Sequence, residues 1–176
     1  MKTPSREPVQ QLSDIYMLNE RLNQLVIEHL DPAAWRATSP GSRTRTIAAI
    51  FSHMHNIRCK WVRLSAPHLK IPAPLNRYTC KQNEASAALA ASALRCSEML
   101  AQASAGRVSQ FHRDGWAKRW RTGPAMLAYM LAHDAHHRGQ VCLLAHQLGF
   151  KLPIDAAHGI WNWEKLWREC GFHPPL

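Results

Sequence analysis

The 176-residue sequence contains no apolar run near the roughly 20 residues that a membrane-spanning helix needs. It also lacks the apolar stretch of a secretory signal near its first residues, so we expect a cytoplasmic protein with no membrane partner. There is no repeat at a fixed period, no low-complexity segment and no linker long enough to divide the chain. We therefore expect a single domain over residues 1–176.

No two of the five cysteines form a Cys-x-x-Cys pair, and their number is odd. This argues against a disulfide framework and a cysteine-rich zinc site, so free and mostly packed thiols are expected. Acidic residues are scarce, with 12 Asp and Glu against 22 Lys and Arg, which gives a formal net charge of +10. Such a balance fits nucleic acid, a small anionic substrate or a solvated basic face, and does not choose among them.

Helical periodicity is the main structural signal that the sequence does contain. Apolar residues recur at helical spacing over about 10–30, 44–64, 83–103 and 124–148. A short last helix is predicted over 160–169, whereas 106–123 is irregular, with a turn near 111–115 between short extended pieces. Four long helices with short connections predict an all-α fold, a four-helix bundle with a short extra C-terminal helix.

Several residues indicate where these helices begin and end. Ser13 or Asp14 is a candidate cap for the first helix, and Asp31-Pro32 stops it because proline cannot continue the backbone hydrogen bonds. Pro124 suits the first turn of the fourth long helix, and Gly149 suits its C-terminal cap.

Histidine is the unusual residue type, with 11 in the chain and three within one five-residue stretch. His133 and His137 are four residues apart, so on a helix they lie one above the other, separated by about 6 Å along the axis. Their stripe at helical spacing is largely apolar and also contains Met126, Met130, Gln140, Leu144 and Leu148. One metal ion, bonded to both at about 2.1 Å, would satisfy the two imidazoles. Two core histidines with ordinary hydrogen bonds are the alternative.

The second helix is predicted to supply a third imidazole. His53 lies in a stripe at helical spacing with Ile50, Ile57, Trp61 and Leu64. A lone histidine on an apolar face is more often a core residue than a ligand, but convergence with two more favours a metal. His55 points about 160° away from His53 and is the alternative ligand if the register differs. His136 points about 100° from His137, which places it beside the site, on the surface or in proton transfer.

Three imidazoles leave at least one coordination position open, which is typical of catalytic rather than structural sites. Imidazole-rich sites suit one divalent transition metal such as zinc, nickel, iron or copper. The stretch 133–137 also approximates the His-Glu-x-x-His zincin motif, in which the glutamate acts as general base. Asp134 is one methylene shorter than glutamate, and no strand-rich half accompanies it, so a zincin protease is disfavoured.

Residues 133–140, His-Asp-Ala-His-His-Arg-Gly-Gln, resemble the His-x-x-His-His-Arg-Gly-Gln signature of the DinB/YfiT-like superfamily. Residues 51–58, with Trp61 eight residues after His53, resemble the helix that carries that family's first ligand. The similarity covers nearly the whole chain. It includes the first helix, the Pro40-Gly41 turn and the stretch Gln147-Leu148-Gly149. Residues 161–164 are similar to a Trp-Glu-Trp segment of some members.

The resemblance implies a four-helix bundle with a three-histidine metal site at one end, in a homodimer. It carries the family's first, second and third ligands onto His53, His133 and His137. Many members have glutamate at the position of Asp134. Relatives include S-transferases that use a low-molecular-weight thiol and others described as metal-dependent hydrolases. The family is distinct from the Y-family DNA polymerase that shares the name DinB.

Three classes of function follow. The first is a metal-dependent S-transferase, in which a thiolate attacks a small electrophilic substrate in a pocket lined by Met126, Met130, Ile57 and Trp61. The alternative is a metal-dependent hydrolase of a small amide or ester, with His136, Asp134 and His112 as candidate general bases. The third is a non-catalytic metal-binding or dimerisation module.

Nucleic-acid binding is disfavoured despite the basic charge and seven tryptophans. Stacking platforms need aromatic side chains interleaved with a basic surface. Trp61 is predicted to lie on a buried face, and Trp161, Trp163 and Trp167 are expected to pack a terminal helix.

Overall fold

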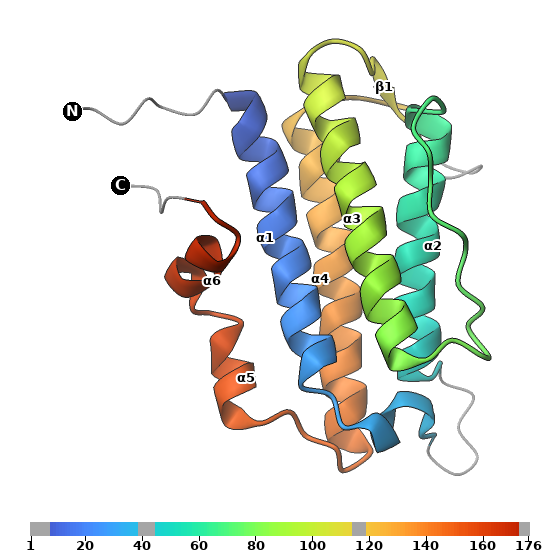
Figure 1. The fold of residues 1–176 in the computed structure, drawn as a ribbon, viewed down its shortest axis with the longest axis vertical. Helices are drawn as coiled ribbons and strands as arrows, with labels where there is room; N and C mark the ends of the chain where they lie inside the picture. The colour runs from blue at the N-terminus through green and yellow to red at the C-terminus, as the bar shows by residue number, and fades with distance from the viewer. Residues whose placement is uncertain (1–7, 39–44, 114–118, 173–176) are drawn as a thin grey trace.

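The computed structural model describes residues 8–38, 45–113 and 119–172. Its four long helices are α1 (Pro8–Glu28), α2 (Ile47–Ser65), α3 (Gln82–Ser104) and α4 (Pro124–Gln147) (Figure 1). Each of α1 and α2 packs against both α3 and α4, so the helices form a closed four-membered bundle. The predicted all-α four-helix bundle is confirmed, and α2 and α4, which carry the candidate ligands, are neighbours.

The helix boundaries agree closely with the predicted ranges, with one exception at the start of α1. Because α1 begins at Pro8, Ser13 and Asp14 are buried inside the helix and do not cap it. After α1, a 3₁₀ helix (η1, Pro32–Arg36) starts at Asp31, whose carboxylate accepts a hydrogen bond from Ala33 N. Pro124 opens α4 as predicted, and Gly149 follows α4 with φ +86°, a conformation that glycine adopts without strain.

Two short helices, rather than one, follow α4. These are α5 (Ile154–Gly159) and α6 (Trp163–Glu169), and both pack against α1 (Figure 1). The predicted start at residue 160 is wrong because Asn162 caps α6, its side chain accepting from Lys165 N at 3.2 Å. A six-residue helix such as α5 is too short to show a periodic apolar pattern.

The predicted packing of the terminal tryptophans is only partly present. Trp167 is half-buried and lies near Phe172, whereas Trp161 and Trp163 are 79% and 50% exposed. The apolar contact of α6 is made mainly by Leu166, which packs with Leu18 and Leu22 of α1. A seven-residue helix has room for one inward face, so its remaining large side chains stay outside.

A two-stranded hairpin connects α3 to α4, as the irregular 106–123 segment predicted. β1 (Gln110–Phe111) is antiparallel to β2 (Trp120–Arg121), with Phe111 opposite Trp120. The residues between them that complete the predicted turn lie partly outside the described residues, as does the Pro40-Gly41 turn before α2.

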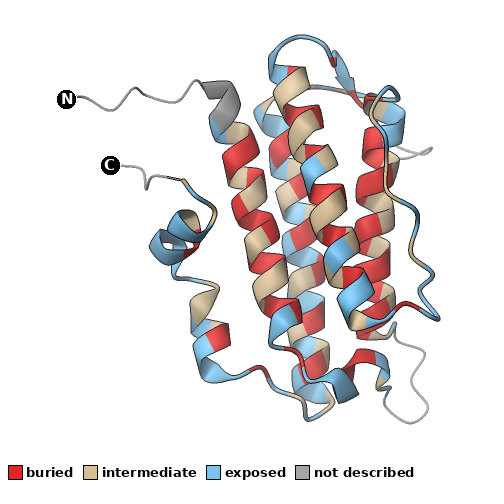
Figure 2. Cartoon of the chain, in the orientation of Figure 1, coloured by how far each residue is buried: buried red, intermediate tan, exposed pale blue. Residues whose placement is uncertain are grey.

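The core consists of two apolar clusters with a buried polar layer between them along α2 and α4. One cluster includes Phe51, Leu89 and Val141, and the other includes Trp61 and Met130. Figure 2 shows buried residues on the facing sides of all four long helices. Between the clusters lie three side chains that are 0–3% exposed and joined by ion pairs, Glu20, Arg58 and Asp134. A charged layer inside a bundle requires its members to be paired with one another.

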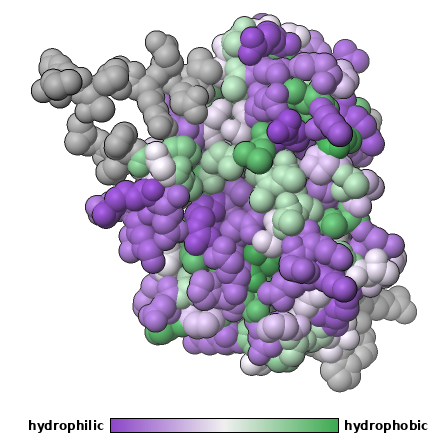
Figure 3. Space-filling view, viewed as in Figure 1, coloured by the Kyte–Doolittle hydropathy of each residue, from purple (hydrophilic) through white to green (hydrophobic). Residues whose placement is uncertain are grey.

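The surface seen from the same side in Figure 3 is mostly hydrophilic, with apolar residues in separate patches. No described helix combines the length and apolar character needed to cross a membrane. All five cysteines are free, as predicted, and Cys59, Cys80 and Cys96 are buried.

Candidate metal centre

Three imidazoles from two helices converge beside the polar layer. His53 comes from α2, and His133 and His137 come from successive turns of α4. One ring nitrogen of each lies within 4.8 Å of the corresponding nitrogens of the other two. The ring centroid of His53 is 5.6 Å from that of His133 and 4.7 Å from that of His137. The predicted convergence of these side chains is therefore present, and the set of nitrogen donors fits one divalent transition metal.

His133 shows most directly that the cluster has spare bonding capacity. Its Nδ1 lies 3.3 Å from Asp134 Oδ1, so Nδ1 carries the proton and Nε2 keeps its lone pair. His133 Nε2 is buried and has no hydrogen-bond partner among the described residues. Trp61 packs edge-on against the ring at 4.9 Å and fixes its plane. A buried acceptor without a partner is costly unless something else satisfies it, and a metal ion does so.

His137 is oriented in the same way by a different side chain. Its Nδ1 lies 2.8 Å from Gln140 Oε1, which accepts the Nδ1 proton and leaves Nε2 as the donor atom. Histidine ligands of metals usually donate the second ring N–H to an oxygen in this manner. In both histidines of α4, Nε2 is therefore the ring nitrogen left to bind a metal ion.

His53 lies at the edge of the core rather than in the predicted apolar stripe. The buried face of α2 runs through Phe51, Met54 and Arg58, while Leu64 is 38% exposed. The stripe is thus rotated relative to the prediction, and His53 is half-buried between core and surface. Burial, together with the positive charges of His137, His133 and Arg45, lowers the pKa of His53 to about 4. The ring is consequently neutral at pH 7, as metal binding requires.

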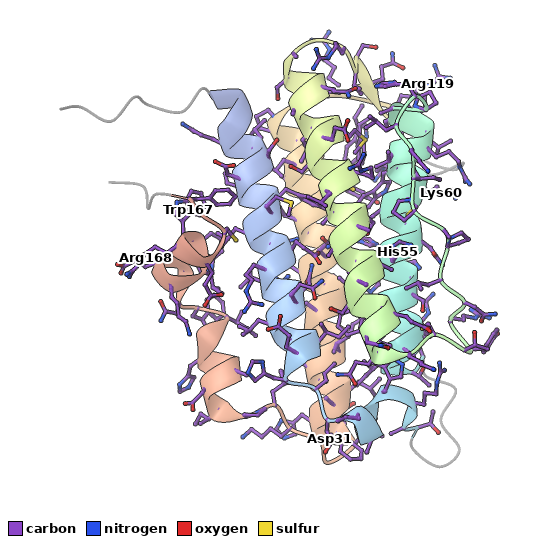
Figure 4. All side chains as sticks on the ribbon, in the orientation of Figure 1. Asp31, His55, Lys60, Arg119, Trp167 and Arg168 are labelled. Carbon is purple, nitrogen blue, oxygen red and sulfur yellow. The ribbon has the colours of Figure 1, made fainter. Side chains whose placement is uncertain are left out.

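His55, the alternative ligand, has a different role. It is fully buried, and its two ring nitrogens lie 2.9 Å from Ala88 O of α3 and 2.9 Å from Ala73 O of the connection between α2 and α3. Figure 4 labels His55 between α2 and α3. Since both nitrogens are occupied by backbone carbonyls, His55 does not join the metal cluster.

Asp134 links the imidazole cluster to the buried charges. Its Oδ2 accepts from Arg58 at 2.6 Å and from Asn19 at 2.8 Å, while Oδ1 faces His133. Burial alone would raise the pKa of Asp134. The charge of Arg58 and the hydrogen bonds from His133 and Arg58 outweigh it, so the pKa is about 2. Asp134 is therefore an anion that holds His133 in one tautomer.

Arg58 is the residue at this site that sequence reasoning missed. Its two terminal nitrogens lie 2.6 Å from Glu20 Oε2 and 2.6 Å from Asp134 Oδ2, and the side chain is fully buried. A usable signal exists, because Phe51, Met54 and Arg58 follow one another at helical spacing. Arg138 of the family-like signature was also missed as a contact, and it donates to Asn19 and Asn23 of α1.

The other predicted site residues lie nearby or apart. His136 is exposed, with its ring centroid 5.0 Å from that of His137. His112 follows β1, and its backbone N–H donates to Ser65 at the end of α2. Of the four predicted lining residues, only Ile57 lines the cavity beside His53, whereas Met126, Met130 and Trp61 pack into the apolar core.

Together these features define a class of protein, a helical bundle with an imidazole cluster that fits a metal ion. The chain belongs to the DinB family, whose model matches residues 7–166. Neither a curated protein nor a solved structure matches the chain.

Proposed function

We propose that this protein is a metal-dependent enzyme in which His53, His133 and His137 bind one divalent ion of zinc, nickel or iron. The observation that carries the proposal is His133 Nε2, a buried nitrogen with no hydrogen-bond partner among the described residues, on a ring that clusters with two further imidazoles. No carboxylate or thiolate belongs to the cluster among the described residues, so a fourth protein ligand does not close it. Such a donor set is typical of catalytic centres.

In the proposed reaction, the thiolate of a low-molecular-weight thiol would attack carbon of a small electrophile, forming a C–S bond as the C–O bond of an epoxide opens or a halide ion leaves. When bound, the metal ion supplies the Lewis acidity that keeps a thiol deprotonated near neutral pH. The residues of this chain contribute orientation. Asp134 and Gln140 hold the Nδ1 protons of His133 and His137, and Arg58 holds Asp134. Burial of Asp134 favours this positioning role over direct contact with a substrate.

The first test is elemental analysis of protein purified without an affinity tag. About one zinc, nickel or iron per chain is expected, and a His53→Ala/His137→Ala variant should lose it. The matched control is His146→Ala/His158→Ala, which removes two exposed histidines and should retain the metal. No metal in the unmodified protein, before or after reconstitution, would refute the proposal.

The second test is turnover. Metal-loaded protein is mixed with candidate thiols and with epoxide or halide electrophiles, and loss of free thiol is followed. Turnover that survives metal removal at the same rate would refute metal-dependent S-transfer. Metal-dependent stability without any turnover would favour the non-catalytic module instead.

One observation favours hydrolysis of a small amide or ester as a second candidate. The exposed ring of His136 lies beside His137 and is free to move a proton at the edge of the cluster. A His136→Gln variant should then lose ester hydrolysis while retaining the metal.

The homodimer and the cytoplasmic location stay predictions.

A further inference from the structure

A basic cavity of about 350 Å³ adjoins His53 on the outer side of α2. Its other wall is the connection between α2 and α3, residues 66–81. The charged side chains that line it are all cationic: Arg45, Lys60 and Arg77. Among the described residues, no carboxylate lines the cavity beside Arg45 or Arg77. Figure 4 labels Lys60 on α2. A concave surface with charges of one sign concentrates ions of the opposite sign.

The far wall of this cavity is fixed to α2 by hydrogen bonds. Asn56 Nδ2 donates to Leu75 O at 2.9 Å, and Leu75 N donates back to Asn56 Oδ1 at 2.9 Å. His55 contacts Ala73 O two residues earlier. The connection therefore holds its place without a ligand, and the cavity is preformed, as most small-molecule sites are.

The guanidinium of Arg77 contacts the side chain of the neighbouring Tyr78. It donates to the hydroxyl of Tyr78 and lies 4.6 Å from the centroid of the Tyr78 ring. An ordered planar guanidinium loses little conformational freedom when it pairs with a carboxylate or phosphate, and its remaining N–H groups stay available.

Arg45 connects the cavity to the imidazole cluster. It lines the cavity together with His53, in the segment just before α2. A negative group bound by Arg45 would therefore lie next to the candidate metal centre.

We propose that this cavity binds the carboxylate or phosphate group of a small anionic substrate or thiol, held by Arg45 and Arg77 with its reactive end at His53. The inference rests on the proposed function, since it assigns the cavity to the substrate of the same centre. A volume of about 350 Å³ is at the lower end of the range for ligand sites, which suits a compact anion.

The test uses metal-free protein, so that an anion cannot bind to a metal ion. Succinate, inorganic phosphate and the neutral succinamide are titrated at constant ionic strength. Binding is followed by the NMR signals of the Asn56 side-chain amide and the Leu75 backbone amide. We expect saturable shifts with succinate or phosphate and none with succinamide. The tighter of the two anions assigns the site to a carboxylate or to a phosphate.

Two double variants with the same charge change decide whether the cavity is responsible. Arg45→Gln/Arg77→Gln should weaken anion binding by roughly tenfold or more, because charge-assisted hydrogen bonds are lost. Arg107→Gln/Arg119→Gln removes two exposed arginines outside the cavity and should leave the affinity unchanged. Equal affinities in the two variants, or no saturable shift in the unmodified protein, would overturn the inference. Circular dichroism verifies that both variants fold.

These outcomes are separable from those of the proposed function. Anion binding at Asn56 and Leu75 in a protein that takes up no metal would refute the proposed function and keep the anion site. In an active enzyme, the cavity variant should raise KM for the anionic substrate with little change in kcat, the pattern of a lost binding group. An unchanged KM would overturn the inference while leaving the metal-dependent reaction intact.

Discussion

Two polar regions of the bundle adjoin each other at Asp134 and are built in opposite ways. In the ion network, Arg58 pairs with both Glu20 and Asp134, while its Nε has no partner in the described part of the chain. In the imidazole cluster, each Nδ1 on α4 has an oxygen partner, whereas His133 Nε2 has none among the same residues. The charges of the network are paired with one another within the protein, whereas the ring nitrogens of the cluster have bonding capacity that an added ligand can use. Burial alone therefore does not distinguish a structural group from a ligand.

Removing Arg58 should give the largest effect, because it breaks the region that depends on internal pairing. Arg58→Met leaves Glu20 and Asp134 buried without their counter-ion, and should lower the free energy of unfolding by about 3–5 kcal/mol. Urea unfolding of metal-free protein measures this. The control is Arg168→Met, which removes an exposed ion pair to Glu164 and should cost under about 1 kcal/mol. Equal losses of unfolding free energy in the two variants would show that the buried ion network stabilises the fold no more than an exposed ion pair does.

Substitutions of His55 and His53, two histidines of α2, should further distinguish a structural group from a metal ligand. His55→Ala removes a buried ring and its polar contacts with two carbonyl oxygens, so it should cost about 2–4 kcal/mol of stability while metal uptake persists. His53→Ala should lose metal uptake at little cost in stability, since the half-buried ring of His53 lies against the other imidazoles. Urea unfolding and metal analysis of both variants test the pair. Loss of metal in His55→Ala with normal folding would contradict the assignment.

Asp134 belongs to both regions, so its change sharpens the comparison. Asp134→Asn keeps the shape but removes the charge that holds the His133 Nδ1 proton. Metal affinity should fall roughly 10- to 100-fold, as for other carboxylates that orient a histidine ligand. Competition with a chromogenic chelator measures it on protein verified as folded. Asp155→Asn, an exposed change on α5, serves as control, and equal affinities would refute the orienting role.

The smallest effect concerns pH. The pKa of His53 is about 4 in the folded protein and 6.5 as a free side chain, so the unfolded chain takes up the proton first as pH falls. The contribution of His53 to the unfolding free energy of metal-free protein is therefore fully present above pH 6.5 and is lost between pH 6.5 and 4. Solvent at the half-buried ring screens this effect. His53→Gln should show a shallower decrease in unfolding free energy, and identical pH profiles would contradict it.

Local patterns in the sequence were sufficient for the long helices and for the three converging histidines. They were insufficient for the rotation of α2, because helical spacing does not say which neighbours cover a face. Arg58 illustrates this, since a long basic side chain is normally exposed and only its pairing with Glu20 and Asp134 allows burial. The basic cavity has no local signal either. It exists because Asn56 brings Leu75 and Arg77 to the side of α2.

The paired hydrogen bonds between Asn56 and Leu75 also bear on rates. The Leu75 amide lies in an irregular connection, yet its proton is held by a residue of α2. Its exchange with solvent should therefore follow the opening of this tether rather than the faster fluctuations of an open loop. A ligand that arrives meets a wall already in position, so association needs no prior closure. Differences in affinity among anions should then appear mainly in how slowly each one leaves.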